Sequence, residues 1–410
     1  MKQATAKSLT LKCALLQGLY WMSFCSIYSF AAVFLLSKNF KNEQIGILLA
    51  ISNIISVILQ PTIGSLADKA AKIPLKSIIS GLALINMILL IGLIAVPGSG
   101  AANAVFYGGT LALTLTLQPL LNSLIFEYIN EGTHINYGIA RGVGSLSFAL
   151  ISSALGFLIN RYRPAFLPFV CIGLLACLFL VVQTFPAAKA KEKQKAEADV
   201  PDEKNASGGF FSFLKKYDRF PFFLLALAFL FVFHTIVNTY LVQVMKHVGG
   251  SDGDVGLSLT VAAICEMPAM MGFGFLVSKF KSGTLLKFSG CFYVVRSLLF
   301  LFSTSVLAVN FAQLFQGLSF AIYVPASVYY INQLMNKEDK VKGQTFVVGS
   351  STLGSVFGSV TGGWLLDHAS VTAMLAVGTA AAAAGCLLLF YSVKTRTEKL
   401  ADAENSLQEA

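Results

Sequence analysis

Charge is scarce in this sequence. Only 12% of its 410 residues are charged, while 56% are hydrophobic and the mean hydropathy is +0.72. Because a soluble chain carries about a quarter charged residues, this apolar surplus is too large for an interior core and must face lipid. The composition therefore predicts an all-α membrane protein.

Several motifs that carry chemistry are also missing. The sequence has no Walker loop GxxxxGK[ST], no dinucleotide-binding GxGxxG and no metalloprotease HExxH. Its seven cysteines lie in apolar segments without a CxxC pair, so neither a zinc site nor a disulfide framework is indicated. These absences argue against an enzyme or an ATP-driven pump and predict no cofactor and no metal.

What the sequence does have is long apolar runs. A membrane helix needs roughly 20 mostly apolar residues. Twelve runs of this kind are found, at 11–37, 43–66, 75–97, 102–128, 136–160, 162–185, 220–245, 252–278, 284–304, 306–334, 341–366 and 370–393.

A polar segment divides these runs into two sets of six. Residues 187–218 mix both charges with Pro, Gly and Ser, which is typical of a flexible linker. The sequence thus predicts one bundle at 1–186, a cytoplasmic linker, a second bundle at 219–396 and a disordered tail at 397–410. An internal repeat supports the division, because one constant offset relates Gly46 to Gly256 and the segment 64–69 to 274–279.

The distribution of basic residues predicts the orientation. Most of the 30 lysines and arginines fall on one side of the membrane if both termini and the linker are cytoplasmic. The outer loops would then hold only Lys38, Lys41, Arg161, Arg163 and Lys246. We therefore expect a multi-pass protein of the inner membrane, and the net charge of +10 needs no nucleic-acid partner.

The loop after the second run carries a recognisable motif. Residues 64–69 read Gly-Ser-Leu-Ala-Asp-Lys, and Lys72 follows. This resembles the signature loop G-x-L-x-D-R/K of the major facilitator superfamily. The resemblance implies twelve helices in two six-helix bundles, with a gating role for Gly64, Asp68, Lys69 and Lys72. Asp68 would latch the cytoplasmic side by pairing with a basic residue or a helix N-terminus.

Within that superfamily, segments 46–64 and 138–144 resemble the lactose permease and related oligosaccharide:proton symporters. Ionisable residues inside membrane helices are costly and usually functional. Five lie well inside the runs expected here, namely Glu127, Arg141, His234, Glu266 and Arg296.

The resemblance implies a substrate site. In the permease, a glutamate and an arginine on helices four and five contact the sugar, and Glu127 and Arg141 match them by motif. Phe148 stands where the permease has a stacking tryptophan. The remaining expected substrate-binding residues are Tyr20, Trp21, Asn122, Gln313 and Gln316. A structural Glu127–Arg141 pair, or a Glu127 at the cytoplasmic surface, is the alternative.

The resemblance also implies a proton-coupling site. Glu266 matches the permease's glutamate on helix eight, and Arg296 matches its arginine on helix nine, with a structural Glu266–Arg296 pair as the alternative. Burial favours the neutral form of a carboxyl group, so a buried glutamate can load and release protons beside a permanent arginine charge. His234, a turn before Asn238, titrates near neutral pH and is assigned to the same set, with a packing role as its alternative.

Helix ten departs from the permease, which carries Lys, His and Glu there. The corresponding face here reads Gln313, Gln316 and Ser319. The proton machinery must therefore differ, or coupling is absent.

The sequence favours a monomeric secondary transporter that couples protons to the symport of a small polar solute by alternating access. A sugar or oligosaccharide, a nucleoside and an aromatic acid all fit the expected residues. Proton-driven efflux of drugs or metabolites and non-coupled uniport are the alternatives.

Overall fold

The computed structural model describes residues 2–69, 74–96, 100–130, 132–135, 137–186, 216–336 and 339–393, without the side chains of 2–7, 66–69 and 130. Throughout these ranges the regular elements are helices. The predicted latch side chains of Asp68, Lys69 and Lys72 lie outside the described residues, as do most of the predicted linker and the tail at 397–410.

The first half of the chain forms seven α-helices and two short helical turns. They are α1 (Lys2–Phe24), η1 (Cys25–Ser29), α2 (Ala31–Ser37), α3 (Asn42–Lys69), α4 (Leu75–Ala95), α5 (Ala101–Asn130), α6 (Tyr137–Arg161), η2 (Pro164–Phe166) and α7 (Leu167–Gln183).

The second half begins with α9 and has more broken helices. Its elements are α9 (Phe220–Thr239), α10 (Leu241–His247), α11 (Asp254–Met271), α12 (Phe273–Lys279), α13 (Ser282–Leu301), α14 (Val306–Leu314), α15 (Phe320–Leu334), α16 (Lys340–His368) and α17 (Val371–Ser392).

These helices fall on all twelve apolar runs expected from the sequence. By length and composition, nine of the described helices could cross a membrane, and the pair Ser8–Ser29 with Ala31–Ser37, bent by 46°, makes a tenth span. Of the remaining two runs, 306–334 holds α14 and α15, and 341–366 holds α16. The first of these is broken and the second is rich in Gly and Ser, so neither is a single strongly apolar helix. The twelve-helix prediction is confirmed.

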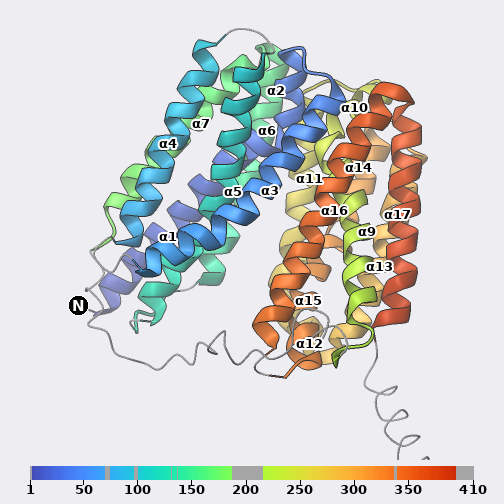
Figure 1. Ribbon diagram of the computed structural model, residues 1–410. Coiled ribbons are helices and arrows are strands. Elements are labelled where there is room, and N and C mark those ends of the chain that lie inside the picture. Colours follow the sequence, from blue (N-terminus) through green and yellow to red (C-terminus); the bar gives the residue numbers. More distant parts are fainter. Residues whose placement is uncertain are drawn as a thin grey trace, which may run out of the picture.

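The two halves stand side by side as bundles that meet at one end and diverge at the other (Figure 1). Across the seam α3 packs on α16, and α6 packs on α11. We call the diverging end, where α1 and α9 begin and α7 and α17 end, the linker face. The other end is the opposite face.

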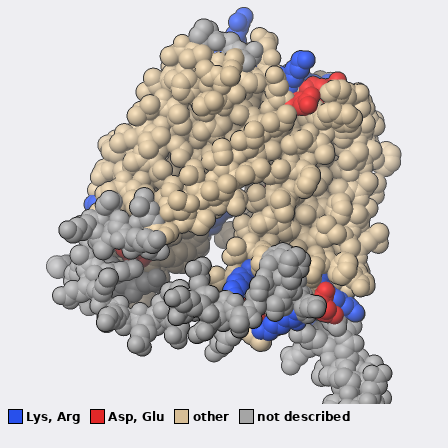
Figure 2. Space-filling view, viewed as in Figure 1, with Lys and Arg blue, Asp and Glu red and all other residues tan. Residues whose placement is uncertain are grey.

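The surface between the two ends is apolar. In Figure 2, Lys, Arg, Asp and Glu gather toward the two ends and leave the outward surface of both bundles between those ends without them. Ile88, Phe157 and Leu387 are 65%, 71% and 73% exposed. Large apolar side chains this exposed require a hydrocarbon surrounding, so the middle of the protein is a lipid-facing belt.

Glycines bring the two halves into backbone contact near the opposite face. A Cβ atom on Gly46 of α3 would overlap the carbonyl oxygen of Ser359 in α16, and one on Gly256 of α11 would overlap that of Ser152 in α6. The repeat that relates Gly46 to Gly256 in the sequence therefore marks two equivalent seam positions. Only a residue without Cβ permits this approach.

Side chains from each half also cap a helix of the other half. The Asp367 carboxylate, at the end of α16, accepts hydrogen bonds from the backbone N–H of Asn42 (3.3 Å) and of Glu43 (2.8 Å) at the start of α3. Asn160, at the end of α6, accepts one from the N–H of Gly253, just before α11 (3.0 Å). All three bonds satisfy N–H groups that a helix start leaves unpaired. The opposite face is thus closed by matched contacts.

We predict that Gly256→Ala opens the opposite face, because the new methyl group meets the Ser152 carbonyl oxygen. A single cysteine at Thr239, in a variant without the native cysteines, should react about tenfold faster with a membrane-impermeant reagent applied from that face, a shift of about 1.4 kcal/mol between the two states. Gly173→Ala is the control, since nothing lies within 4 Å of the Cβ position there. Equal rates in both variants would contradict the seam model.

The start of the second bundle is fastened at the linker face. Lys216 Nζ lies 2.6 Å from Asp339 Oδ2, and the Tyr217 hydroxyl donates to the same oxygen at 2.9 Å. The Lys216 bond, aided by that of Tyr217, lowers the pKa of Asp339 from its usual 3.8. A lowered pKa stabilises the fold above pH 3.8, and that contribution is lost as the pH falls through the lowered value.

Asp339→Asn should therefore lower thermal stability near neutral pH and make no difference in strong acid. The expected loss is about 0.5–1 kcal/mol, because Lys216 is half exposed to solvent. Asp218→Asn changes an exposed aspartate of the same segment and serves as the control. Thermal melting across pH checks this, and a deficit that persists in strong acid would assign the effect to packing.

Candidate functional site

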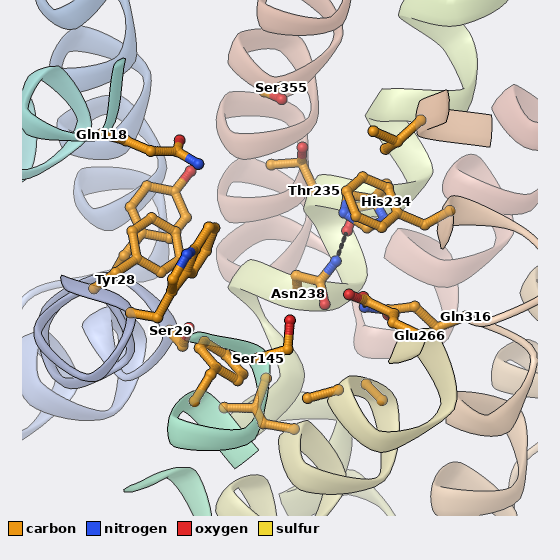
Figure 3. Close-up of a pocket in the computed structure, with 18 of the residues that line it drawn as sticks. Tyr28, Ser29, Gln118, Ser145, His234, Thr235, Asn238, Glu266, Gln316 and Ser355 are labelled. Carbon is orange, nitrogen blue, oxygen red and sulfur yellow. Dashed lines mark hydrogen bonds between the residues drawn. The ribbon is translucent and has the colours of Figure 1, made fainter. Parts of the chain in front are cut away.

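A cavity of about 450 Å³ lies between the two bundles. Its walls come from α1, η1, α5 and α6 on one side and from α9, α11, α15 and α16 on the other. Figure 3 shows the side chains pointing into it from both sides. The surface is hollowed between the bundles at the linker face (Figure 2), and the seam contacts close the other end.

The wall from the first half is largely aromatic. The rings of Phe24 and Tyr28 stack with centroids 4.8 Å apart, and Trp21 meets Phe24 edge-on at 5.3 Å and Phe148 at 6.4 Å. Offset and edge-on ring pairs of this kind hold one another in place. The result is a rigid apolar surface on one side of the cavity.

Arg141 of α6 lies against this aromatic wall. Its guanidinium sits 4.4 Å from the centre of the Trp21 ring, and Nη1 donates to Ser145 Oγ one helical turn on (2.9 Å). Trp21 in turn donates to Gln17, and Gln17 donates to Asn122 Oδ1 (2.9 Å). Asn122 therefore supports the ring that positions Arg141, instead of lining the cavity itself.

The wall from the second half presents hydrogen-bonding groups. His234 of α9 stacks on Phe320 with centroids 4.4 Å apart, and its Nδ1 has no hydrogen-bond partner among the described residues. Asn238 donates Nδ2 to the His234 carbonyl oxygen (2.8 Å), which leaves its own amide oxygen facing the cavity in Figure 3. This wall can therefore both accept and donate hydrogen bonds to a solute.

Glu266 and Arg296 are linked through a glutamine. Arg296 Nη2 donates to Gln313 Oε1 (2.6 Å) and to Gln316 Oε1 (2.5 Å), and Gln316 Nε2 donates to Glu266 Oε1. Arg296 is 0% exposed, whereas Glu266 and Gln316 line the cavity. The described part of the chain has no direct Glu266–Arg296 ion pair. Arg296 is thus connected to Glu266 on the cavity wall by hydrogen bonds through the Gln316 amide.

A break between α14 and α15 brings Gln316 to this place. Residues 315–319 form tight turns, with Gln316 N bonded to the Gln313 carbonyl oxygen at 3.0 Å. Gly317 packs against the backbone of Cys265 in α11, where a Cβ atom would overlap the carbonyl oxygen. Broken helices at mid-depth are a common way for transporters to build sites, because irregular backbone is tolerated where it lines a cavity.

The structure brings together seven residues of the sequence-based site. Those that line the cavity are Trp21, Arg141, Phe148, His234, Asn238, Glu266 and Gln316. Tyr20, Gln313 and Arg296 are buried behind its walls. Glu127 lies in the last turn of α5 and is not among the lining residues. Gly64 lies in α3 with open space beside it.

Sequence reasoning missed Phe24, Ser145, Thr235 and Phe320, which also line the cavity. Phe24 has a detectable signal, since it falls between Trp21 and Tyr28 at helical spacing. Phe320 follows the break between α14 and α15, so its direction could not be extrapolated from a continuous helix.

The MFS_1 like family is the family whose model matches the sequence, over residues 10–376. The chain belongs to this family. Two curated relatives match over almost the full length: the uncharacterized transporter YwbF of Bacillus subtilis (strain 168), 23% identical over 392 residues and 94% of each chain, and the maltose permease of Geobacillus stearothermophilus, 24% identical over 90% of this chain and 93% of its own. The resemblance to transporters, not enzymes, is confirmed.

Solved structures share the fold. The nucleoside transporter NupG superposes with a TM-score of 0.77 at 16% identity, covering 93% of this chain and 98% of that one. The D-xylose-proton symporter gives a TM-score of 0.72 at 15% identity, covering 94% and 98%. The chain is therefore a multi-pass membrane transporter with the twelve-helix major facilitator fold.

Substitutions of Trp21, which lines the cavity, and of its neighbour Tyr20, which is buried behind the wall, test which of the two contributes to solute binding. We predict that Trp21→Leu weakens solute binding about tenfold, because Arg141 loses a cation–π contact of about 1 kcal/mol and its fixed direction. Tyr20→Phe should have no effect, since the Tyr20 hydroxyl has no hydrogen-bond partner among the described residues. Thermal stabilisation by a panel of small polar solutes measures both. Equal losses in the two variants would contradict this assignment.

Proposed function

We propose that the protein is a proton-coupled symporter of a small hydroxylated solute, of the sugar or nucleoside class, working by alternating access. The observation that carries the proposal is the placement of Glu266 on the cavity wall, opposite Arg141 of the other bundle and in contact with the buried Arg296 through Gln316. One acid and one base on facing walls favour a neutral solute with both donors and acceptors.

The cavity supports a solute of this class. Its volume of about 450 Å³ suits a solute of sugar or nucleoside size. The aromatic wall offers a flat apolar surface, while His234, Asn238 and Gln316 offer hydrogen bonds from the other side. Among the similar proteins, a maltose permease and a D-xylose-proton symporter agree with this class.

We infer that the linker face is cytoplasmic, from the excess of Lys and Arg on that side. The described conformation is then open to the cytoplasm and closed to the outside. Rocking of the bundles about the cavity would break the seam at Gly46 and Gly256 and close the linker face.

Glu266 is the proposed proton carrier. It is the acidic residue among the described residues that line the cavity. Arg296 stays protonated, so its charge favours release of the proton once the solute has left. Proton and solute would then move inward together down the proton gradient.

We predict that Glu266→Gln abolishes accumulation of solute driven by a pH gradient but retains exchange between labelled and unlabelled solute. Exchange survives because it needs no net proton release. Glu43→Gln, an acid at the opposite face outside the cavity, is the matched control and should accumulate normally. The assay is uptake and counterflow of radiolabelled maltose, xylose and uridine in proteoliposomes.

Other results of this assay would indicate a different proton site, a uniporter or an exporter. If Glu266→Gln still accumulates solute against its gradient, the proton site lies elsewhere, with His234 the next residue to test. A wild-type protein that equilibrates solute without any response to pH would be a uniporter. Accumulation driven only by a proton gradient of opposite sign would make it an exporter.

A further inference from the structure

The contact between Arg296 and Gln316 fixes the direction of the Gln316 amide. A guanidinium carries donors only, so the atom that faces it must be the amide oxygen. Arg296 Nη2 meets Gln316 Oε1 at 2.5 Å, and Arg296 is fully buried. Turning the amide over would set two donors against each other in a buried place, which costs the full desolvation of both.

The amide nitrogen of Gln316 must therefore face Glu266. Nε2 donates to Glu266 Oε1 and has no free lone pair with which to accept. While this contact lasts, Oε1 acts as an acceptor, and the carbonyl oxygen of a protonated carboxyl group accepts a hydrogen bond better than its hydroxyl oxygen does. A proton that binds Glu266 is therefore favoured on the second carboxylate oxygen, Oε2. Figure 3 shows the Glu266 carboxylate directed into the cavity toward Asn238.

We propose that Gln316 is a positioning residue that reserves Oε1 of Glu266 and sends the transported proton to Oε2, so that proton and solute meet at one oxygen atom. This inference rests on the proposed function, in which Glu266 carries the proton. On loading, an O–H bond of a hydronium ion breaks as Oε2–H forms, which leaves water; on release, Oε2–H breaks and the proton returns to water as hydronium.

The shared oxygen selects the solute group that can bind there. With the proton bound, Oε2–H donates, and without it Oε2 accepts. A hydroxyl group can rotate to serve both states. A carbonyl oxygen fits only the loaded state and an ammonium group only the empty one. A hydroxyl against Glu266 is therefore the group that allows binding before and after proton transfer.

Other charged and titratable groups also face Glu266. They are Arg141 from α6 and Arg296 with Tyr293 from α13, while Cys265 is its neighbour in α11 and His234 of α9 lines the same cavity. Of these groups, only Arg296 is connected to Glu266 by hydrogen bonds through Gln316 among the described residues. A test of Gln316 therefore needs a control variant that removes an equivalent hydrogen bond from Arg296.

Gln313 provides the matched control. It accepts a hydrogen bond from the same Arg296 Nη2 atom at 2.6 Å, is fully buried and does not line the cavity. Gln313→Met and Gln316→Met each remove one acceptor from Arg296 and keep an unbranched side chain of similar size. Only the Gln316 change removes the donor to Glu266.

The experiment is infrared titration of the purified full-length protein without solute, over about pH 4 to about pH 9. The protonated carboxyl band that disappears in Glu266→Gln identifies Glu266. In Gln316→Met this band should move to higher wavenumber, because the Oε1 carbonyl loses its hydrogen bond. Its midpoint should rise by about one pH unit, a tenfold change in proton affinity, because the charged form loses a donor. Gln313→Met should leave the wavenumber unchanged.

An equal wavenumber shift in the two Met variants, or none in Gln316→Met, would overturn the proposal. Gln316→Asn, whose amide is too short to keep both contacts, repeats the test if the Met variant does not fold. Failure of the proposed function has a different signature, since the wild type would then show no band that depends on Glu266.

Discussion

The fold of the second bundle is organised around the need to hold one permanent charge away from water. Arg296 is fully buried, and an isolated charge in such a place costs several kcal/mol unless hydrogen bonds compensate it. Gln313, in the last turn of α14, and Gln316, in the break between α14 and α15, both accept from Nη2, while Nε and Nη1 have no hydrogen-bond partner among the described residues. The break, the link to Glu266 and the polar wall of the cavity are therefore parts of one solution.

A second constraint is close packing between the bundles. Seam glycines let α3 approach α16 and α11 approach α6 until backbones touch, and reciprocal caps from Asp367 and Asn160 close the same end. Because these contacts lie at one end, the cavity is accessible from the other. The seam sets which side is open, while the Arg296–Gln316–Glu266 chain sets what the cavity can bind and protonate.

Much of this was predictable from the sequence for physical reasons. The bilayer fixes the length of apolar runs, so the twelve spans could be found, and charges in lipid must turn inward, so Arg141 and Glu266 were expected to face a cavity. The bridging role of Gln316 was not predictable, because α14 ends at Leu314 and α15 begins only at Phe320. Glu127 falls in the last turn of α5, and a sequence places the end of a helix only to within one or two residues, so the depth of Glu127 could not be predicted.

The central claim is that solute and proton cross together through a cavity whose acid is Glu266. Its most direct test is the external pH of a weakly buffered suspension of proteoliposomes, without any imposed gradient, when maltose, xylose or uridine is added. Symport predicts an immediate rise in external pH in step with solute uptake, and no rise with Glu266→Gln. Uptake of solute with no change in external pH would contradict the account.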